Sequence, residues 1–102
     1  MMNKNKPGED LYSTLQVFAQ IDGVLLKKAR QYDTGIEYAG MELLKEMYRQ
    51  NILDKDMYER LVTVRRCRNE ILFNGYMPTV QEISECEEVL RRLREEDEHE
   101  KL

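Results

Sequence analysis

The chain has 102 residues, enough for one domain with a single hydrophobic core. Charged residues make up 35% of the sequence and the formal net charge is −4, so overall charge gives no attraction to nucleic acid or an anionic membrane. The sequence has no apolar run as long as a membrane span and no signal-peptide core near its N-terminus. Two cysteines are too few for a disulfide framework, and their spacing does not suggest a zinc site. We therefore expect a soluble, cytoplasmic protein in a reducing compartment, with no membrane association, metal or cofactor.

The first predicted helix covers residues 9–32 and follows a polar stretch, residues 1–8, that we expect to be a flexible arm. Apolar residues recur in this helix at the three- and four-residue steps of one face: Leu11, Leu15, Phe18, Leu25, Ala29 and Tyr32. Asp22 falls on the same face, between Phe18 and Leu25. A carboxylate in that place calls for a cationic partner inside the bundle.

The second predicted helix covers residues 36–50. Thr34 and Glu37 have the spacing of a capping box, in which each side chain bonds a free backbone N–H at the helix start. The residues expected to face inward are Ile36, Leu43, Leu44, Met47 and Tyr48. A short Asn-Ile-Leu turn then leads to Asp54, a suitable N-cap for a third helix.

The third predicted helix covers residues 55–73. Its inner face carries Met57, Leu61, Val64, Arg68, Ile71 and Leu72, so one arginine lies on an otherwise apolar face. We expect Asn74 and Gly75 to end the helix, because both tolerate the left-handed backbone of a C-cap. Cys67 is expected to be a small buried side chain, as is Cys86 of the next helix.

The fourth predicted helix starts after Pro78, where Thr79 and Glu82 form a second capping box. Its inward residues are Val80, Ile83, Cys86, Val89, Leu90 and Leu93. The charge run from Arg91 is expected to fray, with residues 96–102 as a charged tail. No segment alternates like a strand, so the sequence predicts an all-α, four-helix, up-and-down bundle over residues 9–95.

The sequence offers few residues for chemistry. It has no Gly-rich phosphate loop, no paired metal-binding histidines and no nucleophile elbow. The exception is the end of the third helix, where Arg68 and Asn69 are followed by Phe73 and Asn74 in the stretch CRNEILFNG.

This stretch resembles the motif of the HEPN superfamily (higher eukaryotes and prokaryotes nucleotide-binding domains), whose typical local form is LRNxIxHG. The preceding residues are also similar, with a helix, a short Asn-Ile-Leu turn and a helix leading into Arg-Asn, so that the resemblance spans roughly residues 41–93. It implies a helical bundle that pairs with a second copy, the two motifs facing one cleft. In active relatives the His handles protons at the ribose 2′-hydroxyl and the Arg stabilises phosphate charge during metal-independent RNA cleavage.

Carried onto this chain, the resemblance makes Arg68 the motif arginine and Asn69 its neighbour, while Phe73 stands at the His position and Asn74 follows it. Neither Phe73 nor Asn74 exchanges a proton near pH 7, which the cleavage chemistry requires. The resemblance therefore implies a catalytically degenerate HEPN-like protein that acts by dimerisation and by binding a protein, with RNA as a further candidate ligand. A defence, toxin–antitoxin or mobile-element setting is implied by the resemblance alone.

Two alternatives remain open. One is an active ribonuclease in which Arg68 and Asn69 are assisted by another base, such as a tyrosine or Glu70. The other is an unrelated helical adaptor, in which Arg68 forms only a structural ion pair with Asp22.

Expectations for the neighbouring residues follow from the same helix. Arg65 and Arg66 are a candidate basic rim and are expected to be solvated. Phe73 is expected to be a core or interface aromatic. Asn69 should bond backbone near the helix exit, or, as the resemblance implies, orient the residues of the cleft. Asn74 should cap the helix.

Overall fold

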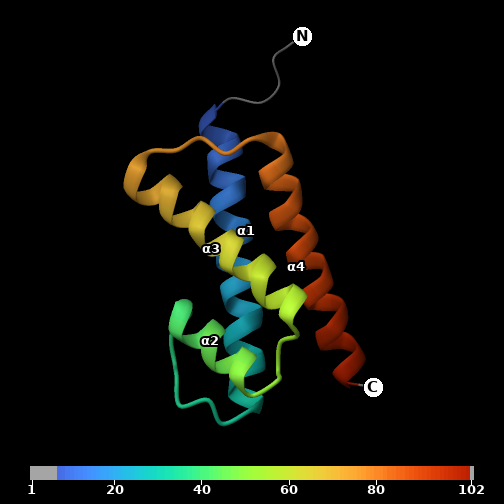
Figure 1. The fold of residues 1–102 in the computed structure, drawn as a ribbon. Helices are drawn as coiled ribbons and strands as arrows, with labels where there is room; N and C mark the ends of the chain where they lie inside the picture. Colours follow the sequence, from blue (N-terminus) through green and yellow to red (C-terminus); the bar gives the residue numbers. More distant parts are fainter. Residues whose placement is uncertain (1–6, 102) are drawn as a thin grey trace.

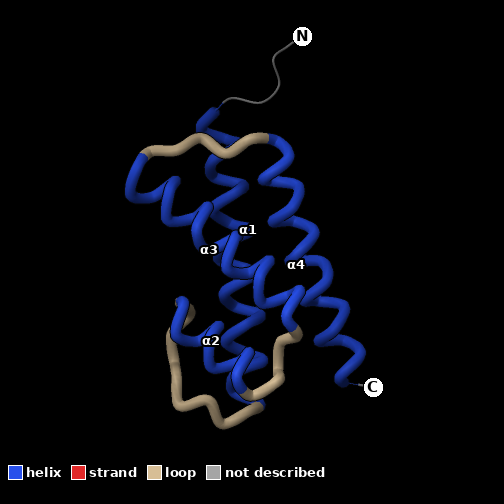
Figure 2. Tube along the Cα trace, viewed as in Figure 1, coloured by secondary structure: helices blue, strands red, loops and turns tan. Residues whose placement is uncertain are grey.

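The computed structural model describes residues 7–101, with side chains described for residues 11–97. Four helices form the chain: α1 (Pro7–Gln31), α2 (Met41–Arg49), α3 (Lys55–Asn74) and α4 (Val80–Lys101). Figure 2 shows no strand in this described part. The predicted all-α, four-helix bundle is therefore confirmed. Within residues 7–101 no helix combines the length and the apolar character needed to cross a bilayer.

The two longest helices, α1 and α4, lie side by side (Figure 1). The third helix, α3, crosses α1 and α4 and diverges from α4 toward its own C-terminal end (Figure 1). The loop of residues 75–79 joins the end of α3 to the start of α4. The short helix α2 packs against α3 near the other end of the bundle. As a result α2 covers only part of α3 and leaves the C-terminal half of α3 with fewer neighbours.

The core draws side chains from all four helices and from the turn between α2 and α3. Its buried members are Phe18, Ile21, Leu25, Ala29, Leu43, Leu44, Met47, Leu53, Met57, Leu61, Val64, Ile71, Cys86, Val89, Leu90 and Leu93. Each large apolar side chain buried in this way contributes about 1.5–3 kcal/mol to the hydrophobic driving force. These residues repeat at three- and four-residue steps, as the helical periodicity predicts.

Both ends of α3 follow local sequence signals. The backbone N–H of Met57 donates to the Asp54 carboxylate at 2.8 Å, which confirms Asp54 as the N-cap. Gly75 follows the helix with φ 67, the left-handed conformation that glycine adopts without a Cβ clash. Gly75 rather than Asn74 therefore supplies the special backbone, and Asn74 is the last helical residue.

The start of α4 is the capping box that the sequence predicts. The Glu82 backbone N–H donates to Thr79 Oγ1 at 3.1 Å, and the Thr79 backbone N–H donates to Glu82 Oε1 at 2.8 Å. The Tyr76 hydroxyl also donates to Glu82 Oε1, at 2.8 Å. These bonds fix the loop that joins α3 to α4.

Replacing Thr79 by alanine should lower the free energy of unfolding by about 1 kcal/mol, because the Glu82 N–H loses its acceptor at the helix start. Urea denaturation followed by circular dichroism measures the change. The control is Ser84→Ala, an exposed position inside α4, which should change stability by less than about 0.5 kcal/mol. Equal effects of the two substitutions would contradict a stabilising role for this cap.

The predicted start of the second helix is wrong. Helix α2 begins at Met41, and its N-cap, Gly40, makes no side-chain cap. Thr34 Oγ1 instead accepts from the Ile36 N–H at 3.2 Å in a local turn, and Gly35 has a left-handed φ of 73. Local hydroxyl bonding of this kind competes with helix formation, so residues 32–40 form a loop. Leu43, Leu44 and Met47 are buried as predicted, but Tyr48 is exposed and Ile36 packs from the loop.

The predicted fraying after Arg91 is also wrong, because α4 continues to Lys101. Asp97 occupies the next inward position after Leu93 and pairs with Lys27 of α1 at 3.6 Å. Arg94 donates to Gln20, also on α1, at 2.9 Å. At the other end, α1 starts at Pro7, so it includes two residues of the expected arm; residues 1–6 lie outside the described part.

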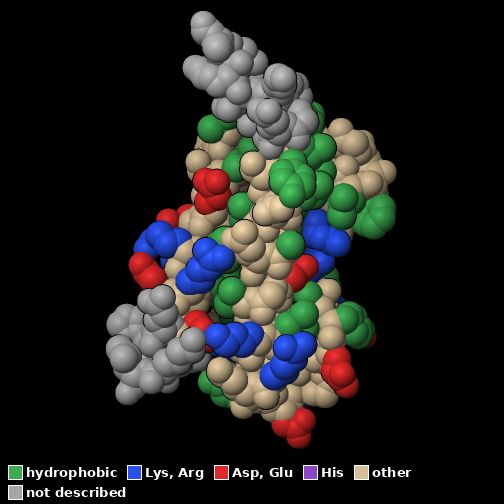
Figure 3. Space-filling view, turned by 180° about the vertical axis from the view of Figure 1, so that it is seen from behind, with side chains coloured by type: hydrophobic (Ala, Val, Ile, Leu, Met, Phe, Trp, Pro, Cys, Tyr) green, Lys and Arg blue, Asp and Glu red, His purple; other side chains and the backbone are tan. Residues whose placement is uncertain are grey.

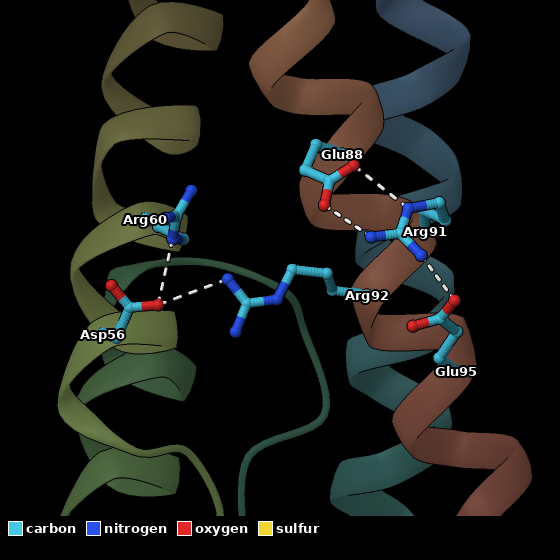
Figure 4. Close-up of polar contacts among 6 residues, drawn as sticks. All are labelled: Asp56, Arg60, Glu88, Arg91, Arg92 and Glu95. Carbon is cyan, nitrogen blue, oxygen red and sulfur yellow. Dashed lines mark hydrogen bonds and ion pairs between the residues drawn. The ribbon is translucent and has the colours of Figure 1, made fainter.

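A charged network on the opposite side of α4 is drawn in Figure 4. Asp56 accepts from Arg60 at 3.0 Å on its own helix and from Arg92 of α4 at 3.3 Å. Arg91 bridges Glu88 and Glu95 within α4. These pairs are exposed and screened by solvent, so they add little to stability. The bond from Arg92 to Asp56 is the one among them that joins the first turn of α3 to α4.

Candidate interaction site at the end of α3

Arg68 lies on the inner face of α3, as its place in the apolar pattern predicts. Its side chain is half-buried and lines a small cavity between α1 and α3 together with Phe18 and Ile21. Its Nη1 donates to Asn69 Oδ1 at 3.3 Å. Asn69 therefore bonds the neighbouring arginine, and not the backbone near the helix exit as predicted.

The ion-pair partner of Asp22 is Arg65, not Arg68. Arg65 Nη2 donates to Asp22 Oδ1 at 2.9 Å, and the two side chains are only 12% and 26% exposed. Arg65 is thus an interior residue, and the expectation that it would be solvated is wrong. It lies nearly one turn before Arg68 on α3, within reach of Asp22 on α1. Arg66, on the outer side of α3, is exposed as expected.

Burial raises the pKa of the Asp22 carboxyl, and the positive charges of Arg65 and Arg68 offset part of that rise. Arg68 therefore acts on Asp22 through its charge without pairing with it. The three residues form one cluster in which Asp22 and Arg65 neutralise each other, so that less positive charge is left for an anionic ligand.

Phe73 projects into solvent, with 76% of its surface exposed. The expectation that it could be a core aromatic is wrong, because α3 has by then diverged from both long helices (Figure 1). Asn74 is also exposed, and its Nδ2 donates to Glu70 Oε1 at 3.1 Å. Leu72, predicted to face inward, is exposed for the same reason as Phe73. Val80, predicted to face inward at the start of α4, is also exposed.

Exposed apolar side chains gather where α3 ends and α4 begins. We call this surface the α3-exit patch; it consists of Leu72, Phe73, Tyr76, Met77 and Val80. Figure 3, which views the molecule from behind, shows hydrophobic side chains at the end of the bundle where α3 terminates, with Lys and Arg side chains beside them. Sequence reasoning could have found the patch, since residues 71–80 hold more apolar side chains than one helix face and a turn can bury.

A cavity of about 230 Å³ lies between α3 and α4, and sequence reasoning did not find it. We call it the α3–α4 cavity; it is lined by Arg60, Thr63, Val64, Cys67, Glu82, Glu85 and Cys86. Both cysteines are free thiols, with Cys86 buried as expected and Cys67 only half-buried. Burial raises the pKa of Cys67, and it raises the pKa of Cys86 to about 12. Thiols in this state stay protonated at neutral pH and are weak nucleophiles and weak metal ligands.

The C-terminal half of α3 therefore carries an arginine cluster and an apolar patch, and the α3–α4 cavity lies along the middle of the same helix, between Arg60 and Cys67. Within the described residues no group of three His, Cys, Asp or Glu side chains is arranged to hold a metal ion. Comparison of the chain with protein-family models, with curated proteins and with solved structures found no match.

Proposed function

We propose that this protein acts by binding rather than by catalysis, as a HEPN-like helical module that associates with a second copy of itself through the α3-exit patch. The observation that carries this proposal is the exposure of Phe73, at 76%, at a helix exit where other apolar side chains are also exposed. Covering apolar surface is favourable by roughly 25 cal/mol per Å². Monomeric soluble proteins rarely expose large apolar patches, and such patches usually mark interaction sites.

The size of the patch suits the centre of an interface between two copies. The patch has two aromatic and three aliphatic members, and Phe73, at 76% exposed, can bring most of the area of an aromatic ring to a contact, whereas Tyr76, at 38%, is already largely covered. A stable interface buries about 800 Å² on each partner, with an apolar centre and a polar rim. Exposed polar residues next to the patch, including Arg66, Glu70 and Asn74, can supply that rim.

The local chemistry supports binding over RNA cleavage. General acid–base catalysis contributes about 10²–10⁴-fold in rate, and neither Phe73 nor Asn74 can provide it. Arg65 is already neutralised by Asp22, and the net charge of −4 does not favour a polyanion. A further protein partner, a cytoplasmic location and a defence, toxin–antitoxin or mobile-element setting belong to the same proposal; they rest on the motif resemblance and on the two free thiols.

Replacing Phe73 by serine should weaken self-association at least tenfold, because it removes the largest exposed apolar side chain of the patch. Sedimentation velocity over a wide concentration range measures the dissociation constant. The matched control is Tyr38→Ser, since Tyr38 is 58% exposed but lies in the loop before α2, away from the patch. This control should associate like the wild type.

Two results would contradict the proposal. A wild-type protein that stays monomeric at the highest attainable concentration would contradict the proposed self-association. Metal-free cleavage of total RNA that disappears in Arg68→Ala would show that the protein is a ribonuclease.

A further inference from the structure

We infer that the Phe73 ring of one copy inserts into the α3–α4 cavity of a second copy. The inference rests on the proposed function, because it names the surface that receives the α3-exit patch. It starts from two features of one helix: an aromatic side chain without a place to pack, and a cavity that no side chain of the same copy fills.

The cavity has the right size for the ring. A phenyl ring is the size of benzene, and an apolar cavity of about 150 Å³ is enough to bind benzene. The α3–α4 cavity measures about 230 Å³, which leaves room for the ring and its methylene group. Rings much larger than this would have to displace Val64 or Cys86, which belong to the core.

The lining of the cavity also suits an aromatic side chain. Val64, Cys67 and Cys86 provide apolar and sulfur contacts, and sulfur packs favourably against aromatic rings. Arg60, Thr63 and Glu85, which are exposed, surround the cavity with polar groups. A buried aromatic anchor inside a polar ring that excludes water is the usual arrangement of a binding hot spot.

The ring that fills this cavity comes from another copy, because Phe73 points away from the cavity of its own chain. Phe73 follows Cys67 by six residues, so the two side chains lie about 120° apart around α3. A two-fold arrangement would place each Phe73 in the cavity of the other copy, so that the same contact is made twice and the assembly closes as a pair.

The test mixes two variants that each lack one half of the contact. Phe73→Ala has an intact cavity but no ring to insert, and Cys67→Phe fills the cavity but keeps Phe73. Each variant alone should associate at least tenfold more weakly than the wild type. An equimolar mixture should form mixed pairs at concentrations where both single variants are monomeric, because one complete contact is restored. Sedimentation velocity with one variant fluorescently labelled measures this, and circular dichroism checks that both variants are folded.

The outcomes separate the inference from the proposed function. If Cys67→Phe associates like the wild type while Phe73→Ala does not, the inference is wrong and the proposed function stands. If the folded variants fail to pair in the mixture, the inference is also wrong. A monomeric wild type overturns both.

A second measurement covers the case in which Cys67→Phe does not fold. Alkylation of Cys67, followed by mass spectrometry of its peptide, should be at least tenfold slower in the associated wild type than in Phe73→Ala at the same concentration. Equal rates would overturn the inference, because an inserted ring must shield this half-buried thiol.

Discussion

Replacing Leu43 by alanine should lower the free energy of unfolding by about 2–5 kcal/mol, the largest effect we expect from a single substitution. Leu43 is 0% exposed and joins α2 to the core against α3. The substitution removes buried methyl groups and leaves a cavity that its neighbours fill only in part. Small domains have total stabilities of about 5–15 kcal/mol, so the loss is a large fraction of the whole. Urea denaturation at low protein concentration measures it.

Leu72→Ala is the matched control, because it makes the same chemical change on a side chain that is 46% exposed. It should cost less than about 1 kcal/mol in the monomer. If the two substitutions destabilise the protein equally, the end of α3 must be packed as tightly as α2, and the α3-exit patch would not exist.

Replacing Asp22 by alanine should cost about 1–3 kcal/mol, because it leaves the interior guanidinium of Arg65 without its carboxylate. Loss of one partner from a fully buried pair costs about 3–5 kcal/mol, and the residual exposure of this pair reduces the figure. Burial raises the pKa of Asp22, so its ionised form is held less favourably in the folded state than in the unfolded chain. The loss of stability in Asp22→Ala therefore comes from leaving Arg65 unpaired, and not from removing a strongly stabilising anion.

A double-mutant cycle isolates this pair. Adding Arg65→Ala to Asp22→Ala should recover most of the loss, with a coupling energy of about 1–2 kcal/mol, whereas adding Arg68→Ala should give a smaller one. Arg66→Ala serves as the exposed-arginine control and should change stability by less than about 0.5 kcal/mol. Stronger coupling of Asp22 to Arg68 than to Arg65 would contradict the observed pairing.

The fold could be predicted where local chemistry decides it. Asp54, Gly75 and the Thr79–Glu82 box set helix ends through bonds within a few residues, and each lies where the sequence places it. Thr34 and Glu37 have the same capping-box spacing as Thr79 and Glu82. The Thr34 hydroxyl closes a local turn instead, because Gly35 takes a left-handed conformation there. A capping pattern alone does not exclude such competing local bonds.

The site was less predictable because it depends on how far α3 diverges from its neighbours. Helical periodicity correctly puts Arg68 on the inner face of α3. It cannot tell that Arg65, nearly one turn earlier, is the residue within reach of Asp22, or that Phe73 has no neighbour to pack against. Those facts depend on the crossing of α3 over α1, and a single sequence read helix by helix carries no information on crossing angles.

The side-by-side packing of α1 and α4 has a consequence for the order in which the chain folds. These helices lie near opposite ends of the sequence, so their contact closes a loop that contains α2 and α3. Contacts between distant segments form late because their loop-closure entropy must be offset first, whereas α2 and α3 are joined by a short turn and can pair early. During synthesis the side of α1 that packs on α4 therefore stays uncovered until α4 has left the ribosome. Until then, the part of α1 that α4 covers in the finished fold is open to solvent or to other chains.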